Sequence, residues 1–255
     1  MLDTILFILE WLRNILLGIA VYFGVCSTKE LFKLNADTKK GKDGAKEKDS
    51  KKEKAGKGIL DIKRFVFAAL TLTVAFLALG FIIENFYGLL DPGFKALSVI
   101  LFSISYLLGI IAFSYFWHHS AKFHKLQVID SLFFSGVFAA ILLWIYYLFR
   151  ASIINSAGSL SLLGKIVYLI HPFAVSLIFL LTLIIHPAHK ANVIRTPLWY
   201  LSSGVFAYFL GYMVMIYAFI RSAPRLIAIL YTMLFLLSAM YFALGFYAAS
   251  KKFGK

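Results

Sequence analysis

The chain has 255 residues, of which 61% are hydrophobic and 15% are charged, and its formal net charge is +14. A soluble domain carries roughly 45–50% apolar and about 25% charged residues, so the composition excludes a soluble globular enzyme and a disordered chain. The single cysteine, Cys26, excludes a disulfide scaffold. We therefore predict an all-α, polytopic integral membrane protein.

Seven apolar windows are long enough to cross a bilayer, which takes about 20 helical residues. They cover residues 4–26, 65–89, 95–117, 128–149, 163–186, 198–220 and 225–249. Turn-forming residues separate them, such as Pro92 after the second window and Pro224 before the last. The pattern predicts one bundle of about seven transmembrane helices with a single long loop.

The first window differs from the others because its polar residues share one helical face. Asp3, Glu10, Arg13 and Asn14 follow helical spacing. Two alternatives remain open at this point. Residues 1–27 form either a first spanning helix or an interfacial helix, which leaves six spans and an N-terminus inside.

Residues 28–64 hold 13 of the 26 Lys and Arg and 7 of the 12 Asp and Glu. Such a segment buries too little apolar surface to offset the entropy of ordering, which predicts a flexible loop. Arg and aromatic residues are not interleaved there as in arms that bind nucleic acid, so we expect no nucleic-acid partner. The segment instead indicates a cytoplasmic loop near anionic lipid headgroups.

The Lys and Arg residues predict the orientation of the chain. Twenty fall on the side of the basic loop and five on the other side. By the positive-inside rule, the loop and the basic tail 251–255 are cytoplasmic and the N-terminus is outside. Residues 65–250 form the six-helix part of the bundle in either alternative for the first window.

Ionisable residues inside apolar windows call for a partner or a role, because a charge at mid-bilayer costs about 2.5–3.5 kcal/mol on insertion scales. Glu10 and Arg13 are three residues apart and can pair. Asp130, near a helix start, fits the helix dipole. Glu84, near the outer end of its window, is a candidate for ligand contact or an ion path. His171 precedes Pro172, which predicts a kink and a cavity.

All six histidines lie in or beside the third and fifth windows. They are His118, His119, His124, His171, His186 and His189. The predicted topology gathers all except His171 at the cytoplasmic face. Because neutral imidazole is a common metal ligand, His118, His119, His186 and His189 are candidate ligands of a haem or a divalent metal.

Three interpretations of these histidines stay open: a zinc or iron site, a b-type haem held by His119 and His186, and interfacial residues that contact phosphates. In span count the chain resembles the seven-helix lipid hydrolases of the ceramidase and adiponectin-receptor type. Their zinc ligands include histidines on the last helix, and 225–249 contains none. The resemblance therefore does not extend to the zinc site.

The chain contains no nucleophile elbow, phosphate-binding glycine loop or spaced carboxylate pair, so we favour a protein that is not an enzyme. The first functional hypothesis is a subunit of a membrane complex with partner subunits, or a ligand-responsive module with a histidine-rich cytoplasmic face. The second is an electron-transfer subunit that binds b-type haem or metal. The third is a transporter or channel with a path through Glu84 and His171.

Overall fold

A computed structural model describes residues 2–40, 50–87, 93–121, 166–185, 195–220 and 224–254, with single positions and short runs between 136 and 164. Its helices are α1 (Leu2–Lys40), α2 (Ser50–Tyr87), α3 (Gly93–Ala121), α6 (His171–Ile185), α7 (Arg195–Ile220) and α8 (Arg225–Phe253). A π-helical turn, η2 (Ile166–Ile170), precedes α6. These ranges contain no strand. The predicted all-α membrane bundle is confirmed.

Five helices in the described ranges are long and apolar enough to cross a bilayer. They are Leu2–Lys33, Asp61–Asn85, Lys95–His118, Thr196–Phe219 and Arg225–Phe253, and they match five of the predicted windows. The fifth window contains the shorter apolar helix His171–Leu183. Most of the fourth window, 128–149, lies outside the described residues, so a total of seven spans stays a prediction.

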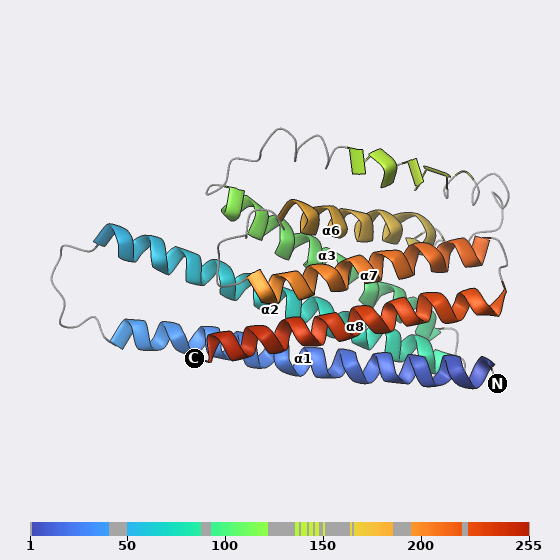
Figure 1. Ribbon diagram of the computed structural model, residues 1–255, viewed down its shortest axis with the longest axis horizontal. Helices are drawn as coiled ribbons and strands as arrows, with labels where there is room; N and C mark the ends of the chain where they lie inside the picture. Colours follow the sequence, from blue (N-terminus) through green and yellow to red (C-terminus); the bar gives the residue numbers. More distant parts are fainter. Residues whose placement is uncertain are drawn as a thin grey trace.

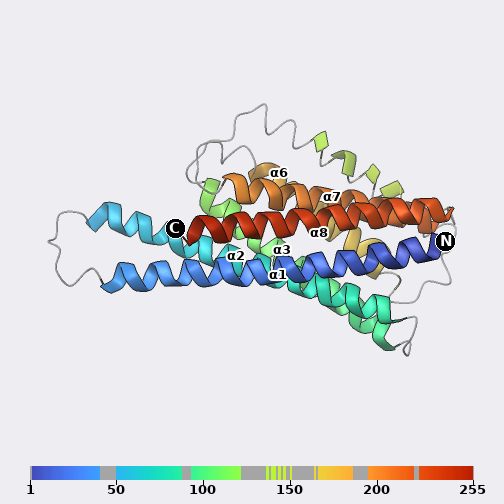
Figure 2. The same ribbon diagram turned by 60° about the horizontal axis from the view of Figure 1, so that its bottom comes forward.

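The helices lie lengthwise beside one another (Figures 1 and 2). α1 packs against α2 and α8, α7 packs against α8, and α6 contacts α3 and α7. α1, α3 and α8 begin at the end of the bundle where α2 and α7 finish, which we call the Glu84 end. The opposite end, where α1 and α2 approach residues 41–49, is called the basic end.

α1 shows why a helix with several polar residues still suits a membrane. Its buried residues Leu17, Ala20, Gly24 and Leu31 recur every three to seven positions and face α2 and α8. Large apolar side chains on the other side remain exposed, such as Phe7 at 61%. A one-sided apolar surface on a helix of this length is suited to lipid, which favours the spanning alternative over the interfacial one.

Helical structure continues into the segment for which we predicted a flexible loop. α1 ends at Lys40 and α2 begins at Ser50, so 28–40 and 50–64 are helical and only 41–49 lies outside the described residues. The reason is that Lys, Glu and Ala are good helix formers, and extending a helix needs no new nucleus. The basic tail predicted for 251–255 is also helical in part. α8 continues to Phe253 and has Lys251 and Lys252 in its last turn.

Arg64 joins the two helices near the basic end. Its Nε donates to the Leu31 carbonyl of α1 at 2.7 Å, and its Nη1 lies 3.0 Å from Oδ1 of Asp61. The side chain is 5% exposed. This contact holds α1 and α2 together near the C-terminus of α8, beyond which both helices continue toward the basic end (Figures 1 and 2).

Candidate functional site

A cavity of about 350 Å³ lies at the Glu84 end, among α2, α3, η2, α6, α7 and α8. Its volume falls in the range of small-molecule sites, about 300–1,000 Å³. Eight of the fifteen side chains on its wall are aromatic: Phe81, Phe102, Tyr106, Tyr208, Tyr212, Phe219, Tyr231 and Phe235. The other polar or charged side chains on the wall are Glu84, Lys95, Ser98 and His171.

Glu84 lies in the last turn of α2 and contributes a carboxylate to the wall. The side chain is exposed. It forms no hydrogen bond, and no ion pair within 4.0 Å, with another side chain in the described part of the chain. Because a carboxylate has only acceptor oxygens, an occupant that brings donors would satisfy it.

His171 is the first residue of α6 and is only 2% exposed. Its Nε2 lies 2.9 Å from Oγ of Ser103 on α3. The single hydroxyl proton of Ser103 is donated to the Val99 carbonyl at 2.8 Å, so the histidine must be the donor in the bond to Ser103. His171 is therefore held as a fixed part of the wall, and its Nε2 is already occupied.

The π-helical turn before α6 exposes a backbone acceptor at the same place. In a π-helix the carbonyl of residue i accepts from the amide of residue i+5, and for Val167 that position is Pro172, which has no N–H. The hydroxyl of Tyr212 on α7 donates to the Val167 carbonyl at 2.9 Å. Tyr212 thus replaces the missing amide and joins α7 to the start of α6.

We expect Tyr212→Phe to lower the free energy of unfolding by about 1–3 kcal/mol, because the Val167 carbonyl then lacks a donor. Tyr217→Phe is the matched control, since Tyr217 lies on the same helix and is 41% exposed. Thermal denaturation in mild detergent measures both variants. Equal melting temperatures for the two variants would contradict this role of Tyr212.

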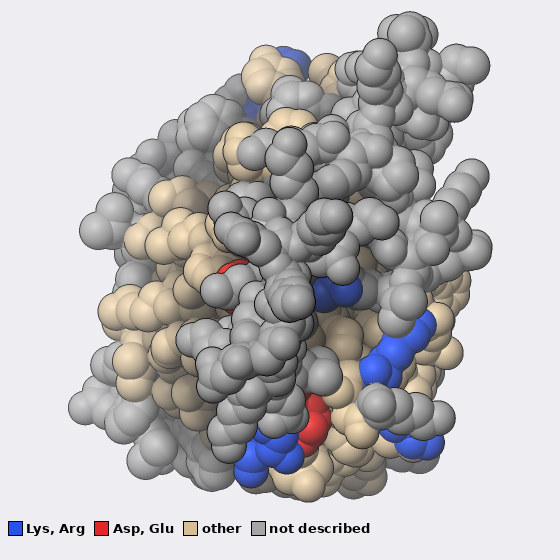
Figure 3. Space-filling model, turned by 90° about the vertical axis from the view of Figure 1, so that its left-hand side faces the viewer, with Lys and Arg blue, Asp and Glu red and all other residues tan. Residues whose placement is uncertain are grey.

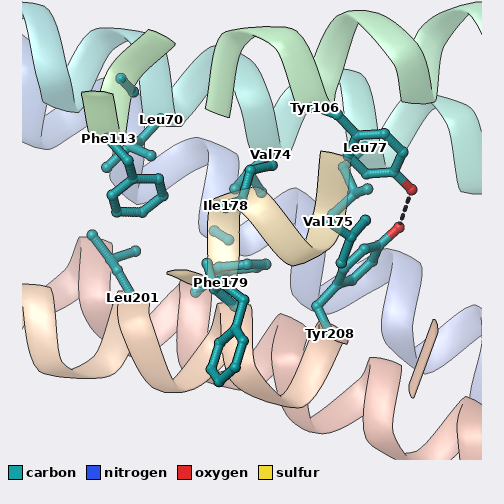
Figure 4. Close-up of a cluster of buried hydrophobic side chains, with 14 of the residues drawn as sticks. Leu70, Val74, Leu77, Tyr106, Phe113, Val175, Ile178, Phe179, Leu201 and Tyr208 are labelled. Atoms are coloured by element: carbon teal, nitrogen blue, oxygen red, sulfur yellow. Dashed lines mark hydrogen bonds between the residues drawn. The ribbon is translucent and has the colours of Figure 1, made fainter. Parts of the chain in front are cut away.

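Tyr106 on α3 and Tyr208 on α7 close the cavity on its inner side. Their hydroxyl oxygens are 2.6 Å apart, and both side chains also border an apolar void of about 40 Å³ deeper in the bundle (Figure 4). Leu70, Val74 and Leu201 are among the side chains that surround this void. The tyrosine pair thus separates the polar cavity from the apolar core. The bond uses one of the two hydroxyl protons, which leaves the other for a further acceptor.

Arg13 of α1 is buried beside the cavity without being part of its wall. It is 4% exposed, and its guanidinium lies 3.7 Å from the centre of the Phe81 ring. Its donors reach Oδ1 of Asn14 at 3.4 Å and Oδ1 of Asn85 at 3.3 Å. The predicted pair with Glu10 does not form within 4.0 Å, because Arg13 turns toward α2 while Glu10 remains half-buried on α1.

The predicted histidine cluster falls largely outside what the structure describes. His118 is an exposed residue near the end of α3. His119 follows it in the same helix, and its side chain is not among those that the structure describes. His124, His186, His189 and Asp130 also lie outside the described residues. Within the described ranges no group of three His, Cys, Asp or Glu side chains could hold a metal ion. The haem and metal hypotheses therefore stay predictions.

The tyrosines of the wall were not predicted from the sequence, because a tyrosine in an apolar window stands out less than a carboxylate or an imidazole. A usable signal was present in α7, where Tyr208 and Tyr212 are four residues apart and so share one helical face.

No protein family, curated protein or solved structure matches this chain. The geometry of the cavity is therefore the evidence for a function.

Proposed function

We propose that this chain is a multi-pass membrane protein that binds a small organic ligand in the cavity at the Glu84 end and acts as a ligand-responsive module. The observation that carries the proposal is an aromatic cavity of about 350 Å³ whose wall includes a carboxylate with no hydrogen bond and no ion pair within 4.0 Å to a described side chain. Glu84 and His171, which the third sequence-based hypothesis places on one path, both belong to this wall.

Binding explains this arrangement better than catalysis does. The Nε2 of His171 is bonded to Ser103, and the hydroxyls of Tyr106 and Tyr208 are bonded to each other. Groups held in this way give a rigid, shaped wall, whereas an acid–base catalyst must reach the proton it moves. The proposal is therefore a non-enzymatic one.

The predicted orientation would place the cavity on the outer side of the membrane. The opposite end carries exposed basic residues on α1 and α8, including Lys29, Lys33, Lys251 and Lys252. Figure 3 looks onto this basic end and shows Lys and Arg surfaces on it. We propose that these residues face the cytoplasm and contact anionic lipid headgroups, and that the exposed apolar faces of the bundle contact lipid or partner subunits.

Transport is a second candidate, and the broken α6 favours it. Discontinuous helices line the substrate sites of many transporters, and here η2 and Pro172 interrupt the helix beside the cavity. The pair Tyr106–Tyr208 and the apolar cluster below it separate the cavity from the basic end (Figure 4). A transport cycle would have to part these residues, whereas ligand sensing would not.

Cysteine labelling tests whether the cavity is a reachable site. Cys26 is the single cysteine, so Cys26→Ser gives a cysteine-free background. Within it, Ser98→Cys places a thiol on the cavity wall, and Ser238→Cys places one between α7 and α8, where Ser238 is 1% exposed. We expect the neutral reagent methyl methanethiosulfonate to modify Ser98→Cys and to leave Ser238→Cys unmodified. Equal resistance of the two thiols would refute the proposed function.

A further inference from the structure

We infer that the ligand of this cavity is a small organic cation, held by the Glu84 carboxylate and by the aromatic rings around it. The inference rests on the proposed function and names the chemical class of its ligand. It follows from three observations. They are the contacts of the charged groups on the wall, the cluster of aromatic rings, and the cation–π contact that one of these rings makes with Arg13.

The charged groups on the wall differ in their partners. Glu84 forms no hydrogen bond and no ion pair within 4.0 Å with a described side chain, and the charges of Arg13 and Lys95 act on it only at longer range. Because the carboxylate oxygens only accept hydrogen bonds, a ligand that brings donors and a positive charge can pair with them directly. The Glu84 carboxylate is thus open to a direct partner on this wall, which favours a ligand of positive charge.

Four aromatic rings of the cavity wall, which belong to α2, α3, α7 and α8, form a continuous cluster. Phe81 precedes Glu84 by three residues, so both side chains lie on the same helical face. The Phe81 ring centre lies 5.0 Å from that of Phe102 and 5.6 Å from that of Phe235. The ring of Tyr208 adjoins Phe235 at 5.1 Å. A carboxylate beside several aromatic rings is the arrangement that recognises quaternary ammonium groups.

One member of this cluster already accepts a cation within the protein. The guanidinium carbon of Arg13 lies 3.7 Å from the centre of the Phe81 ring. Arg13 is bonded to the amide oxygens of Asn14 and Asn85 and is not part of the wall, so it does not occupy the cavity. A cation–π contact is stronger when it is shielded from water, and several rings surround this site.

Three probes of nearly equal shape test the charge of the ligand on the unaltered full-length protein. They are choline, the neutral 3,3-dimethyl-1-butanol and the anionic 3,3-dimethylbutanoate. We expect choline to bind more tightly than the other two in equilibrium dialysis, and to slow methanethiosulfonate modification of Ser98→Cys. Tighter binding of the alcohol or of the carboxylate, or no binding of choline, would overturn the inference.

Two variants locate the charge that choline recognises. Glu84→Gln is nearly isosteric and removes the carboxylate, and we expect it to raise the choline dissociation constant about tenfold or more. Glu30→Gln is the control, because Glu30 pairs with Lys33 near the basic end at 2.9 Å. An unchanged dissociation constant in Glu84→Gln would overturn the assignment to Glu84. Where that variant does not fold, the three probes on the unaltered protein still decide.

The failure of this inference and the failure of the proposed function give different results. If Ser98→Cys is modified and choline does not protect it, the cavity is reachable and its ligand is not an organic cation. If Ser98→Cys resists modification as Ser238→Cys does, the cavity is not reachable and the proposed function itself fails.

Discussion

Gly245→Leu is expected to lower the free energy of unfolding by about 3 kcal/mol or more, because overpacking at a rigid contact forces two helices apart. Gly245 of α8 faces Leu201 of α7. A Cβ at Gly245 would lie 2.8 Å from Cγ of Leu201 and 3.2 Å from its backbone nitrogen. The side chain can rotate, but the nitrogen moves only with α7, whose neighbours hold it in the bundle. Close approach at small residues is how helices associate in membranes.

Gly18→Leu is the matched control for this substitution. Gly18 lies on α1, and no atom outside its own helix lies within 4 Å of a Cβ built there. Leucine is a better helix former than glycine, so Gly18→Leu is expected to be neutral or slightly stabilising. Thermal denaturation in mild detergent, followed by size-exclusion chromatography, measures both variants. Similar stabilities would show that α7 and α8 do not depend on the contact at Gly245.

The membrane fold could be predicted from the sequence because lipid allows the backbone few choices. Every amide within the bilayer must find a partner in the protein, so an apolar stretch such as 65–89 has to be helical. The ends of the helices could not be predicted in the same way. The residues after 27 are charged and were assigned to a loop, yet Lys, Glu and Ala also extend a helix beyond the bilayer.

The cavity could be predicted only in part. Glu84 and His171 stand out because ionisable residues are rare in apolar windows. Tyr106 and Tyr208 come from helices about 100 residues apart in sequence, and only the packing of α3 against its neighbours brings their hydroxyls to 2.6 Å. Arg13 shows the same limit. Its spacing from Glu10 indicated a pair within one helix, while the packing of α1 on α2 gives it Asn85 instead.

For the buried cation we expect Arg13→Lys to be more destabilising than Arg13→Met. Lysine keeps the charge but loses the planar group that reaches two amide oxygens and stacks on Phe81. We therefore expect Arg13→Lys to lower the free energy of unfolding by about 3 kcal/mol. Methionine fills a similar volume and removes the buried charge, and the loss of its hydrogen bonds leaves a cost of about 1 kcal/mol. Thermal denaturation of the two variants in the same detergent shows which of them is the less stable.

The opposite order, with Arg13→Met the less stable variant, would show that a carboxylate such as Glu10 or Glu84 compensates the charge of Arg13. Glu84 and Glu10 interact with the charge of Arg13, but only at longer range than an ion pair. The nearest acceptors of Arg13 are neutral amide oxygens at 3.3–3.4 Å, which are long distances for bonds to a charged donor.

The state of Asn85 explains why we expect the methionine variant to lose so little. While Arg13 holds the Oδ1 of Asn85, the Nδ2 of that amide is buried and has no partner in the described part of the chain. Without the guanidinium the amide can rotate and bring its nitrogen to an acceptor, which offsets part of the lost bonding. Arg13 therefore adds little net stability and chiefly fixes the orientation of Asn85, the residue that directly follows Glu84. This contact positions the last turn of α2, where the carboxylate enters the cavity wall.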